Sequence, residues 1–224
     1  MRFGVIRFPG SCDEVDALLA CRRHGEAELL WHADRDLHDV DAIVIPGGFT
    51  YGDYLRAGAI ARFAPVMDSV AAFARDGGPV LGICNGFQVL CEAGLLPGAL
   101  LPNAALRFVC RQVRLTVESA DTPFTRTRAR GDVLSLPVKH GSGRFQAPER
   151  QLDELESDGL VALRYGEGQN PNGSARDIAG VVNDGRNVLG LMPHPEHAVD
   201  PLTGSSDGNA LFASLARAPE LAAA

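Results

Sequence analysis

The sequence predicts an α/β fold in which a mostly parallel central sheet is covered by helices on both faces. In the first half, short apolar strand-like runs alternate with segments of helical spacing, and this rhythm is typical of a parallel sheet. In the second half, strand-like runs follow one another with few helices between them. We therefore expect some of the later strands to be antiparallel.

The elements of the first half are assigned from their apolar periodicity. We expect strands at residues 3–8, 28–32, 42–45 and 80–83, and helices at 12–24, 60–74 and 85–93. Two helices have a predicted apolar face, one made by Val15, Leu18, Leu19 and Arg22, the other by Ile60, Phe63, Ala64, Met67 and Ala71.

The second half is expected to hold strands at 108–117, 133–138, 160–165, 178–182 and 188–192, with a last helix at about 207–217. The loops at 46–52 and 194–208 are rich in glycine and proline and are longer than simple connections. Ordered loops of that length are often functional, so we expect the site to include them.

Composition narrows the class of protein. A chain of 224 residues suits one domain, which we expect to span 1–224. The net charge of -7 argues against nucleic acid as a partner. We expect no signal peptide, and no apolar run reaches the ~20 residues that a membrane span needs. The number of cysteines, five, is odd, and no two of them form a CxxC pair. We therefore expect neither a disulfide framework nor a zinc site, and a reducing cytoplasmic location fits this pattern.

The strongest local motif is Gly82-Ile83-Cys84-Asn85-Gly86, between a predicted strand and a predicted helix. A nucleophile at such a sharp turn has crowded neighbours, and the two glycines remove the side chains that would clash. The turn raises the sulfur above the carboxyl edge of the sheet, at a helix N-terminus that favours thiolate. A cysteine without this frame is usually a buried small hydrophobe. We assign that structural role to the other cysteines, Cys12, Cys21, Cys91 and Cys110.

A cysteine nucleophile needs a base, and the base needs a group that orients it. His194 follows a predicted strand in Pro193-His194-Pro195-Glu196, and in extended backbone the side chain of Glu196 would point the same way. His197 would then alternate away from both. His140, in a predicted glycine-rich loop, is the rival base. The remaining histidines lie in polar, surface-like stretches: His24, His32 and His38.

Amide hydrolysis by a thiolate builds negative charge on the carbonyl oxygen, which preorganised N–H donors must stabilise. Gly47, Gly48 and Phe49 follow a predicted parallel strand and supply a flexible backbone near the expected site. We predict that the N–H groups of Gly48 and Asn85 form this oxyanion hole. We expect four residues to contact the substrate: Gly47, Gly48 and Phe49 of this loop, and Gln88, one helical turn past Cys84.

Together these motifs make the chain resemble the glutaminase subunits of phosphoribosylformylglycinamidine synthase, which are class I glutamine amidotransferases with a flavodoxin-like domain. The stretch around Tyr51 is specific to these subunits, whereas the elbow and the His-Pro-Glu are shared more widely. The matching stretches are residues 8–11, 45–62, 82–88, 95–98, 108–111, 140–141, 172–174, 177–180 and 192–196.

The resemblance implies Cys84 as nucleophile, His194 and Glu196 as its partners, and glutamine as substrate. It implies that the ammonia passes to a large synthetase, which uses ATP and Mg²⁺ to join it to formylglycinamide ribonucleotide. A small third subunit would bridge this chain and the synthetase. No cofactor is expected in this chain, which also lacks a G-x-x-x-x-G-K-[ST] loop. His140, Tyr51 and Arg56 are expected either beside the catalytic residues or at the partner interface.

Three alternatives stay open on the sequence. The chain could serve a different acceptor, act as a DJ-1-like cysteine hydrolase, or be a non-catalytic subunit that gates its partner. The chain also departs from the resembling subunits at two places. His197 stands where they often have arginine, and an asparagine common before Cys12 is missing.

Overall fold

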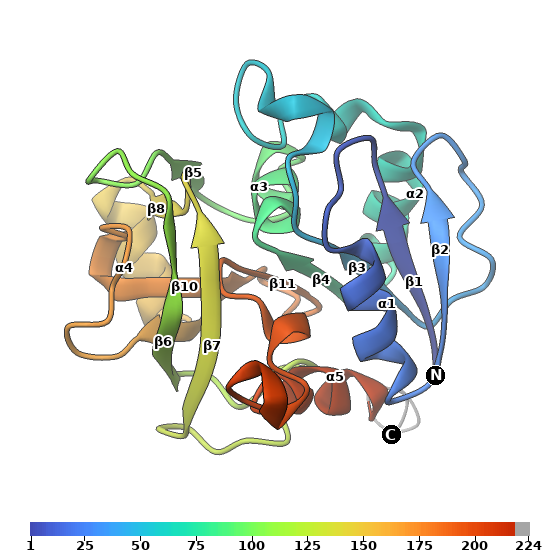
Figure 1. Ribbon diagram of the computed structural model, residues 1–224. Coiled ribbons are helices and arrows are strands. Elements are labelled where there is room, and N and C mark those ends of the chain that lie inside the picture. The colour runs from blue at the N-terminus through green and yellow to red at the C-terminus, as the bar shows by residue number, and fades with distance from the viewer. Residues whose placement is uncertain (218–224) are drawn as a thin grey trace.

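The computed structural model describes residues 1–217, and within them the main sheet has nine strands (Figure 1). Their order across the sheet is β2 (Glu26–Trp31), β1 (Arg2–Arg7), β3 (Ala42–Ile45), β4 (Val80–Ile83), β11 (Val188–Leu191), β10 (Ile178–Val182), β9 (Val161–Tyr165), β6 (Val109–Val117) and β7 (Val133–His140). A separate two-stranded sheet pairs β5 (Ala99–Leu101) with β8 (Arg144–Gln146).

The sheet changes from parallel to antiparallel along its width, as the sequence predicts. From β2 through β1, β3 and β4 to β11, every neighbouring pair is parallel. From β11 through β10, β9 and β6 to β7, every pair is antiparallel. The predicted fold class is therefore confirmed.

Helices cover both faces of the sheet (Figure 1). On one face, α1 (Glu14–Arg22) packs on β1 and β2 and also contacts α5 (Asn209–Ala216). On the other face lie α2 (Pro65–Arg75), α3 (Asn85–Glu92) and α4 (Glu149–Ser157), with α3 resting on β4 and β11. None of the helices within residues 1–217 combines the length and the apolarity that crossing a membrane would require.

The pairing of β4 with β11 positions the functional loops. These strands come from opposite halves of the chain yet run side by side and parallel, with Ile83 opposite Leu191. The carboxyl ends of parallel strands lie at the same edge of a sheet. The segments that follow β4 and β11, which begin with Cys84 and Met192, therefore emerge together.

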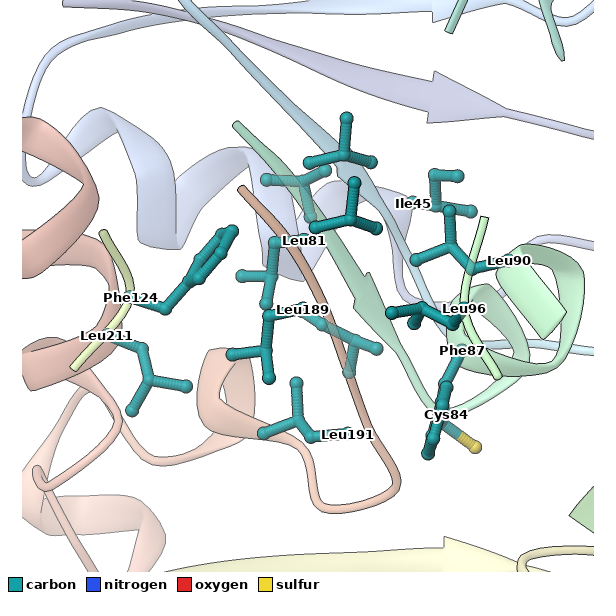
Figure 2. Packing of buried hydrophobic residues seen from close by; sticks show 14 of the residues in the cluster. Ile45, Leu81, Cys84, Phe87, Leu90, Leu96, Phe124, Leu189, Leu191 and Leu211 are labelled. Atoms are coloured by element: carbon teal, nitrogen blue, oxygen red, sulfur yellow. The ribbon is translucent and has the colours of Figure 1, made fainter. Parts of the chain in front are cut away.

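The core beneath this edge is formed by fully buried aliphatic and aromatic side chains of the central strands and of α3 (Figure 2). Leu81, Leu189 and Leu191 lie within it, and Phe87 stacks on Phe145 with ring centroids 5.8 Å apart. Figure 2 shows that the sulfur of Cys84 points away from this cluster. The packed core thus fixes the backbone of the nucleophile and leaves its thiol free for chemistry.

Two predicted apolar faces are wrong in detail. Leu18 of α1 is buried as predicted, but Val15 and Leu19 are exposed, and Ala17 and Cys21 complete the buried face instead. The predicted helix 60–74 is broken: a 3-10 turn at Ala61–Phe63 is followed by α2, which starts at Pro65. Proline lacks an N–H and disfavours helical backbone in the residue before it, so the helix restarts there and Phe63 stays exposed.

Three elements were not expected. The helix α4 and the small β5–β8 sheet lie in stretches to which the sequence analysis assigned no element. The strand β7 also continues past Val138 to His140. This extension corrects the prediction that His140 belongs to a glycine-rich loop, and it carries Lys139 and His140 to the edge of the sheet where Cys84 lies.

Candidate active site

Cys84 occupies the turn between β4 and α3 with the dihedral angles φ 51° and ψ −103°. A side-chain-bearing residue rarely adopts a positive φ, and such strain is common at functional positions. A Cβ on Gly86 would lie 2.0 Å from the carbonyl oxygen of Ile45, and one on Gly82 would lie 2.8 Å from the backbone of Gly86. The two glycines therefore permit the turn, as the sequence predicts.

His194 and Glu196 meet in the loop after β11. His194 Nδ1 lies 2.6 Å from Glu196 Oε1, and both side chains are buried. The backbone is not extended here, because Pro195–His197 forms a 3-10 turn. The expected pairing is present, but the expected reason for it was wrong, and so was the prediction that His197 points away. His197 Nε2 lies 3.3 Å from the same Glu196 oxygen.

The other ring nitrogen of His194 is free for the nucleophile. Nε2 is buried and has no conventional hydrogen-bond partner within residues 1–217. Burial lowers the pKa of His194, but Glu196 and the Cys84 side chain outweigh burial and raise it to about 10. His194 and His197 in turn hold the pKa of Glu196 below its ordinary value, against the opposing effect of burial. This arrangement favours a protonated imidazole beside the sulfur.

The sequence analysis missed two charged residues of this site. Asp13, just before α1, is buried, and its Oδ1 lies 2.6 Å from Nζ of Lys139, near the end of β7. The same carboxylate approaches His194 Nδ1 to 3.6 Å and His197 Nε2 to 3.3 Å. Neither residue stands in a catalytic motif. The only signal near Asp13 was the comparison with the resembling subunits, which differ from this chain just before Cys12.

The glycine loop after β3 presents backbone N–H groups to the site. Gly47 accepts the N–H groups of Cys12 and Asp13, and Phe49 donates to Gly10. In this antiparallel bridge, Gly48 is the residue between the bonded pairs, so its own N–H points away from Ser11. Gly48 lines the cavity above Cys84, whereas Gly47 lies behind it, against Asp13 and His194.

Asn85 is the first residue of α3, so its N–H has no acceptor within the helix. Its fully buried side chain accepts from the N–H of Thr50 and donates to Gln88 Oε1 at 2.8 Å. The structure thus brings together the loop and the helix start that were predicted to supply the oxyanion donors. Their role in catalysis stays a prediction.

A cavity of about 160 Å³ opens above the thiol. Its lining includes six residues that the sequence analysis singled out: Gly48, Phe49, Cys84, Gln88, His140 and His194. The amide of Gln88 is already engaged, since Nε2 donates to the carbonyl oxygen of Ser142 at 2.6 Å. Gln88 therefore shapes the wall with a fixed orientation. The same cavity is lined by Asp13, Asp53 and Lys139, which the sequence did not single out.

His140 forms a neutral part of this wall. Its Nδ1 lies 3.1 Å from Oδ1 of Asn103, which also accepts the N–H of Gly143, so Nδ1 carries the proton. Nε2 then accepts from Asn172 at 3.4 Å. Burial and the neighbouring His194 lower the pKa of His140 to about 4. His140 was expected either beside the catalytic residues or at the partner interface. It lines the cavity together with Cys84 and His194, so it lies beside the catalytic residues.

The structure places Tyr51 and Arg56 farther along the same loop. The Tyr51 hydroxyl lies 2.8 Å from Nδ1 of His32. Arg56 is exposed and makes a two-point ion pair with Glu92, with distances of 2.5 and 2.6 Å. Neither residue lines the cavity within residues 1–217.

Two cysteines differ from their expected structural role. Cys21 is buried and Cys91 packs against the core, as expected, but Cys12 and Cys110 are exposed. Cys12 also lines the cavity. Its Sγ lies 3.6 Å from the carbonyl oxygen of Gly10.

One cluster has the residue types of a metal site: Asp13, His194, Glu196 and His197, whose ligand atoms lie within 4.8 Å of one another. The Lys139 ammonium, 2.6 Å from Asp13, already supplies a cation there. The distance of 2.6 Å between His194 Nδ1 and Glu196 is that of a hydrogen bond rather than of two ligands around an ion. The cluster therefore fits a hydrogen-bonded charge network better than a metal centre.

Comparison with known proteins agrees with this geometry. Residues 1–210 match the family described as CobB/CobQ-like glutamine amidotransferase domain. The chain is 62% identical over 216 residues to "Phosphoribosylformylglycinamidine synthase subunit PurQ" of Rubrobacter xylanophilus, which covers 96% of this chain and 97% of that protein. The subunit of the same name from Nocardia farcinica is 60% identical and covers 96% of each chain.

A solved structure, that of PurLQS from Thermotoga maritima, matches with a TM-score of 0.88 at 43% identity and covers 96% of each chain. The family match and the identity of the relatives both extend over nearly the whole chain. This chain belongs to the CobB/CobQ-like glutamine amidotransferase family and, within it, to the PurQ subunits of phosphoribosylformylglycinamidine synthase.

Proposed function

We propose that this chain is the glutaminase subunit of phosphoribosylformylglycinamidine synthase, which hydrolyses glutamine to glutamate and ammonia for a synthetase on another chain. The observation that carries the proposal is the meeting of Cys84 and His194 at one cavity, with Glu196 2.6 Å from His194 Nδ1, in a chain 62% identical to a PurQ subunit. Residues 1–224 act as a single glutamine amidotransferase domain, which the family match over 1–210 supports.

In the first half of the reaction, the Cys84 thiolate attacks the side-chain amide carbon of glutamine. The imidazolium of His194 then gives its proton to the departing nitrogen, so ammonia leaves and a thioester joins Cys84 to the glutamyl group. Glu196, 2.6 Å from Nδ1, keeps the ring oriented and stabilises its positive charge.

In the second half, neutral His194 takes a proton from water, and the hydroxide that forms attacks the thioester carbon. The C–S bond breaks, glutamate leaves, and the proton on His194 restores the ion pair with the Cys84 thiolate. Both halves pass through a tetrahedral oxyanion. We assign its stabilisation to the N–H groups of Gly48 and Asn85, and removing one such donor typically costs roughly 10²–10³ in rate.

The partners in this proposal are a large synthetase subunit and a small bridging subunit. The likeness to the PurLQS structure supports such an assembly. The synthetase uses ATP and Mg²⁺ to join the ammonia to formylglycinamide ribonucleotide, giving formylglycinamidine ribonucleotide for purine synthesis. A cytoplasmic location belongs to the proposal, because a catalytic thiol must stay reduced.

The test is a comparison of two nitrogen sources in the complex with the synthetase and the bridging subunit. The Cys84→Ala variant should lose product formation from glutamine and keep product formation from added ammonium. Matched loss of both activities would mean that the chain is structural. Glutamine hydrolysis that ignores the synthetase, with no product from formylglycinamide ribonucleotide, would mean that it serves another acceptor.

A further inference from the structure

We propose that Asp13 is a positioning residue for glutamine hydrolysis: a second buried carboxylate that, together with Glu196, holds His194 as an oriented imidazolium. This inference rests on the function proposed above. It assigns to Asp13 a part in the reaction that its place in the chain, far from the elbow and from the His-Pro-Glu segment, gives no reason to expect.

The position of Asp13 supports a role in the site rather than in the helix it precedes. Asp13 is the N-cap residue of α1, where a carboxylate normally accepts from the first backbone N–H groups. Its side chain makes no such bond. Instead Oδ2 lies 3.6 Å from His194 Nδ1, on the side of the ring that also faces Glu196.

The backbone brings Asp13 to this place. Its N–H donates to the carbonyl oxygen of Gly47 at 3.2 Å, which ties it to the loop of the predicted oxyanion hole. A Cβ on Gly47 would lie 2.4 Å from Asp13 Oδ2 and 2.8 Å from His194 Cε1. A side chain on Gly47 would therefore separate the carboxylate from the imidazole, and glycine lets the two approach.

Two cations fix the carboxylate. Lys139 from β7 lies 2.6 Å from Oδ1, and His197 lies 3.3 Å from the same atom. Burial raises the pKa of Asp13, but these partners and His194 hold it well below its ordinary value. Asp13 is thus an anion throughout the working range of pH.

The charge balance explains why both partners are needed. Asp13 and Glu196 are anions, and Lys139, His194 and His197 are their cationic partners when the histidines are protonated. Beyond this group, the Cys84 thiol faces His194, and Glu14 and Asp16 come from α1 itself. Two anions face three cations in this group, so removing one anion enlarges the surplus of positive charge, which opposes the imidazolium.

The test uses two substitutions in the Asp13–Lys139 pair: Asp13→Asn removes the negative charge, and Lys139→Met removes the positive charge. NMR of the ¹³C-labelled His194 ring in the full chain follows its pKa directly. Asp13→Asn should lower the pKa of His194 by about one unit or more, because a nearby anion is lost. Lys139→Met should raise it, because a nearby cation is lost.

Activity gives the second measurement, in the complex with the synthetase. Asp13→Asn should lower kcat for glutamine hydrolysis about 10- to 100-fold with little change in KM, since a charged contact to His194 is lost and the cavity wall keeps its shape. Asp16→Asn is the matched control. Asp16 belongs to α1 and approaches His197 to 3.8 Å, but it is exposed, so its replacement should change neither value.

Unchanged titration of His194 in Asp13→Asn, whatever the loss of rate, would overturn the proposal and leave Asp13 a purely structural role. If Asp13→Asn fails to fold, Lys139→Met decides, and absence of an upward shift there overturns the proposal equally. If wild-type complex fails to release ammonia from glutamine, the proposed function fails, yet the titration of His194 still tests the role of Asp13.

Discussion

Cys84 donates its backbone N–H to the carbonyl oxygen of Leu191 at a distance of 2.8 Å. This bond continues the parallel pairing of β4 with β11 by one residue, beyond Ile83 and Leu191. The nucleophile and the loop that carries the imidazole are therefore held by one ladder of backbone hydrogen bonds. Their relative position depends on how closely these strands and α3 pack.

Gly190→Ala should disturb that packing through Phe87. A Cβ on Gly190 would lie 2.1 Å from the Phe87 ring, so the substitution should cost about 1–3 kcal/mol of unfolding free energy. Phe87→Leu makes room, and the double variant should lose less than the two single variants together, by at least about 0.5 kcal/mol. Urea unfolding measures all four free energies.

Gly94 gives the control, because a Cβ there would meet no atom within 4 Å. The effects of Gly94→Ala and Phe87→Leu on the free energy of unfolding should therefore be additive.

Glu196→Gln should lower kcat for glutamine roughly 10³- to 10⁴-fold with KM nearly unchanged, because an amide can hold the ring in the wrong tautomer and does not stabilise its charge. Steady-state ammonia release in the complex measures both constants. Glu14→Gln is the control, since Glu14 is also a buried carboxylate but pairs with Arg7 at 3.4 Å instead of with His194. Similar losses of kcat in both variants would contradict the orienting role of Glu196.

The sequence was sufficient for the parallel half of the sheet because buried strands read as continuous apolar runs. The bounds of β3 and β4 agree residue for residue with the predicted runs, and so do those of β10 in the antiparallel half. It was less informative about helix faces. The outer face of α1 carries Val15 and Leu19, and periodicity alone does not tell an exposed apolar residue from a buried one.

The site could be predicted only where a local motif reveals it. Cys84 has its glycines, and His194 and Glu196 are near neighbours in the chain. Asp13 and Lys139 come from distant segments, and they meet only because the end of β7 passes close to the start of α1. Such a contact is a property of the tertiary structure, and a single sequence has no pattern that reports it.

The stability of the fold should fall as the pH rises through the titration of His197. The carboxylates of Asp13 and Glu196, each 3.3 Å from Nε2, raise the pKa of His197 to about 9. Because the folded value exceeds the unfolded value of about 6.5, the stabilisation is complete below pH ~6.5 and is lost as the pH passes about 9. Urea unfolding at both ends of this range should show wild type losing about 2 kcal/mol more than His197→Gln. Parallel pH profiles would contradict this coupling.

The rim of the cavity should be where the synthetase docks. Phe49 and Asp53 line the cavity, and the same loop continues into Tyr54 and Leu55, both highly exposed. Leu55 is 91% exposed and follows the exposed Tyr54, and adjoining exposed apolar side chains often mark an interaction site. Free ammonia would also escape from an open cavity, so a partner seated on this rim would conserve it.

Leu55→Asp should therefore weaken binding of the synthetase by about 2 kcal/mol, roughly 30-fold in Kd, and leave the free energy of unfolding unchanged. Leu202→Asp is the matched control, because Leu202 is 95% exposed but belongs to the 3-10 turn Pro201–Thr203, none of whose residues lines the cavity. Titration of the synthetase with each labelled chain measures Kd. Equal weakening by both substitutions would contradict an interface at Leu55. The loss of affinity would then come from the added negative charge, which is the same in both variants, or from an interface elsewhere.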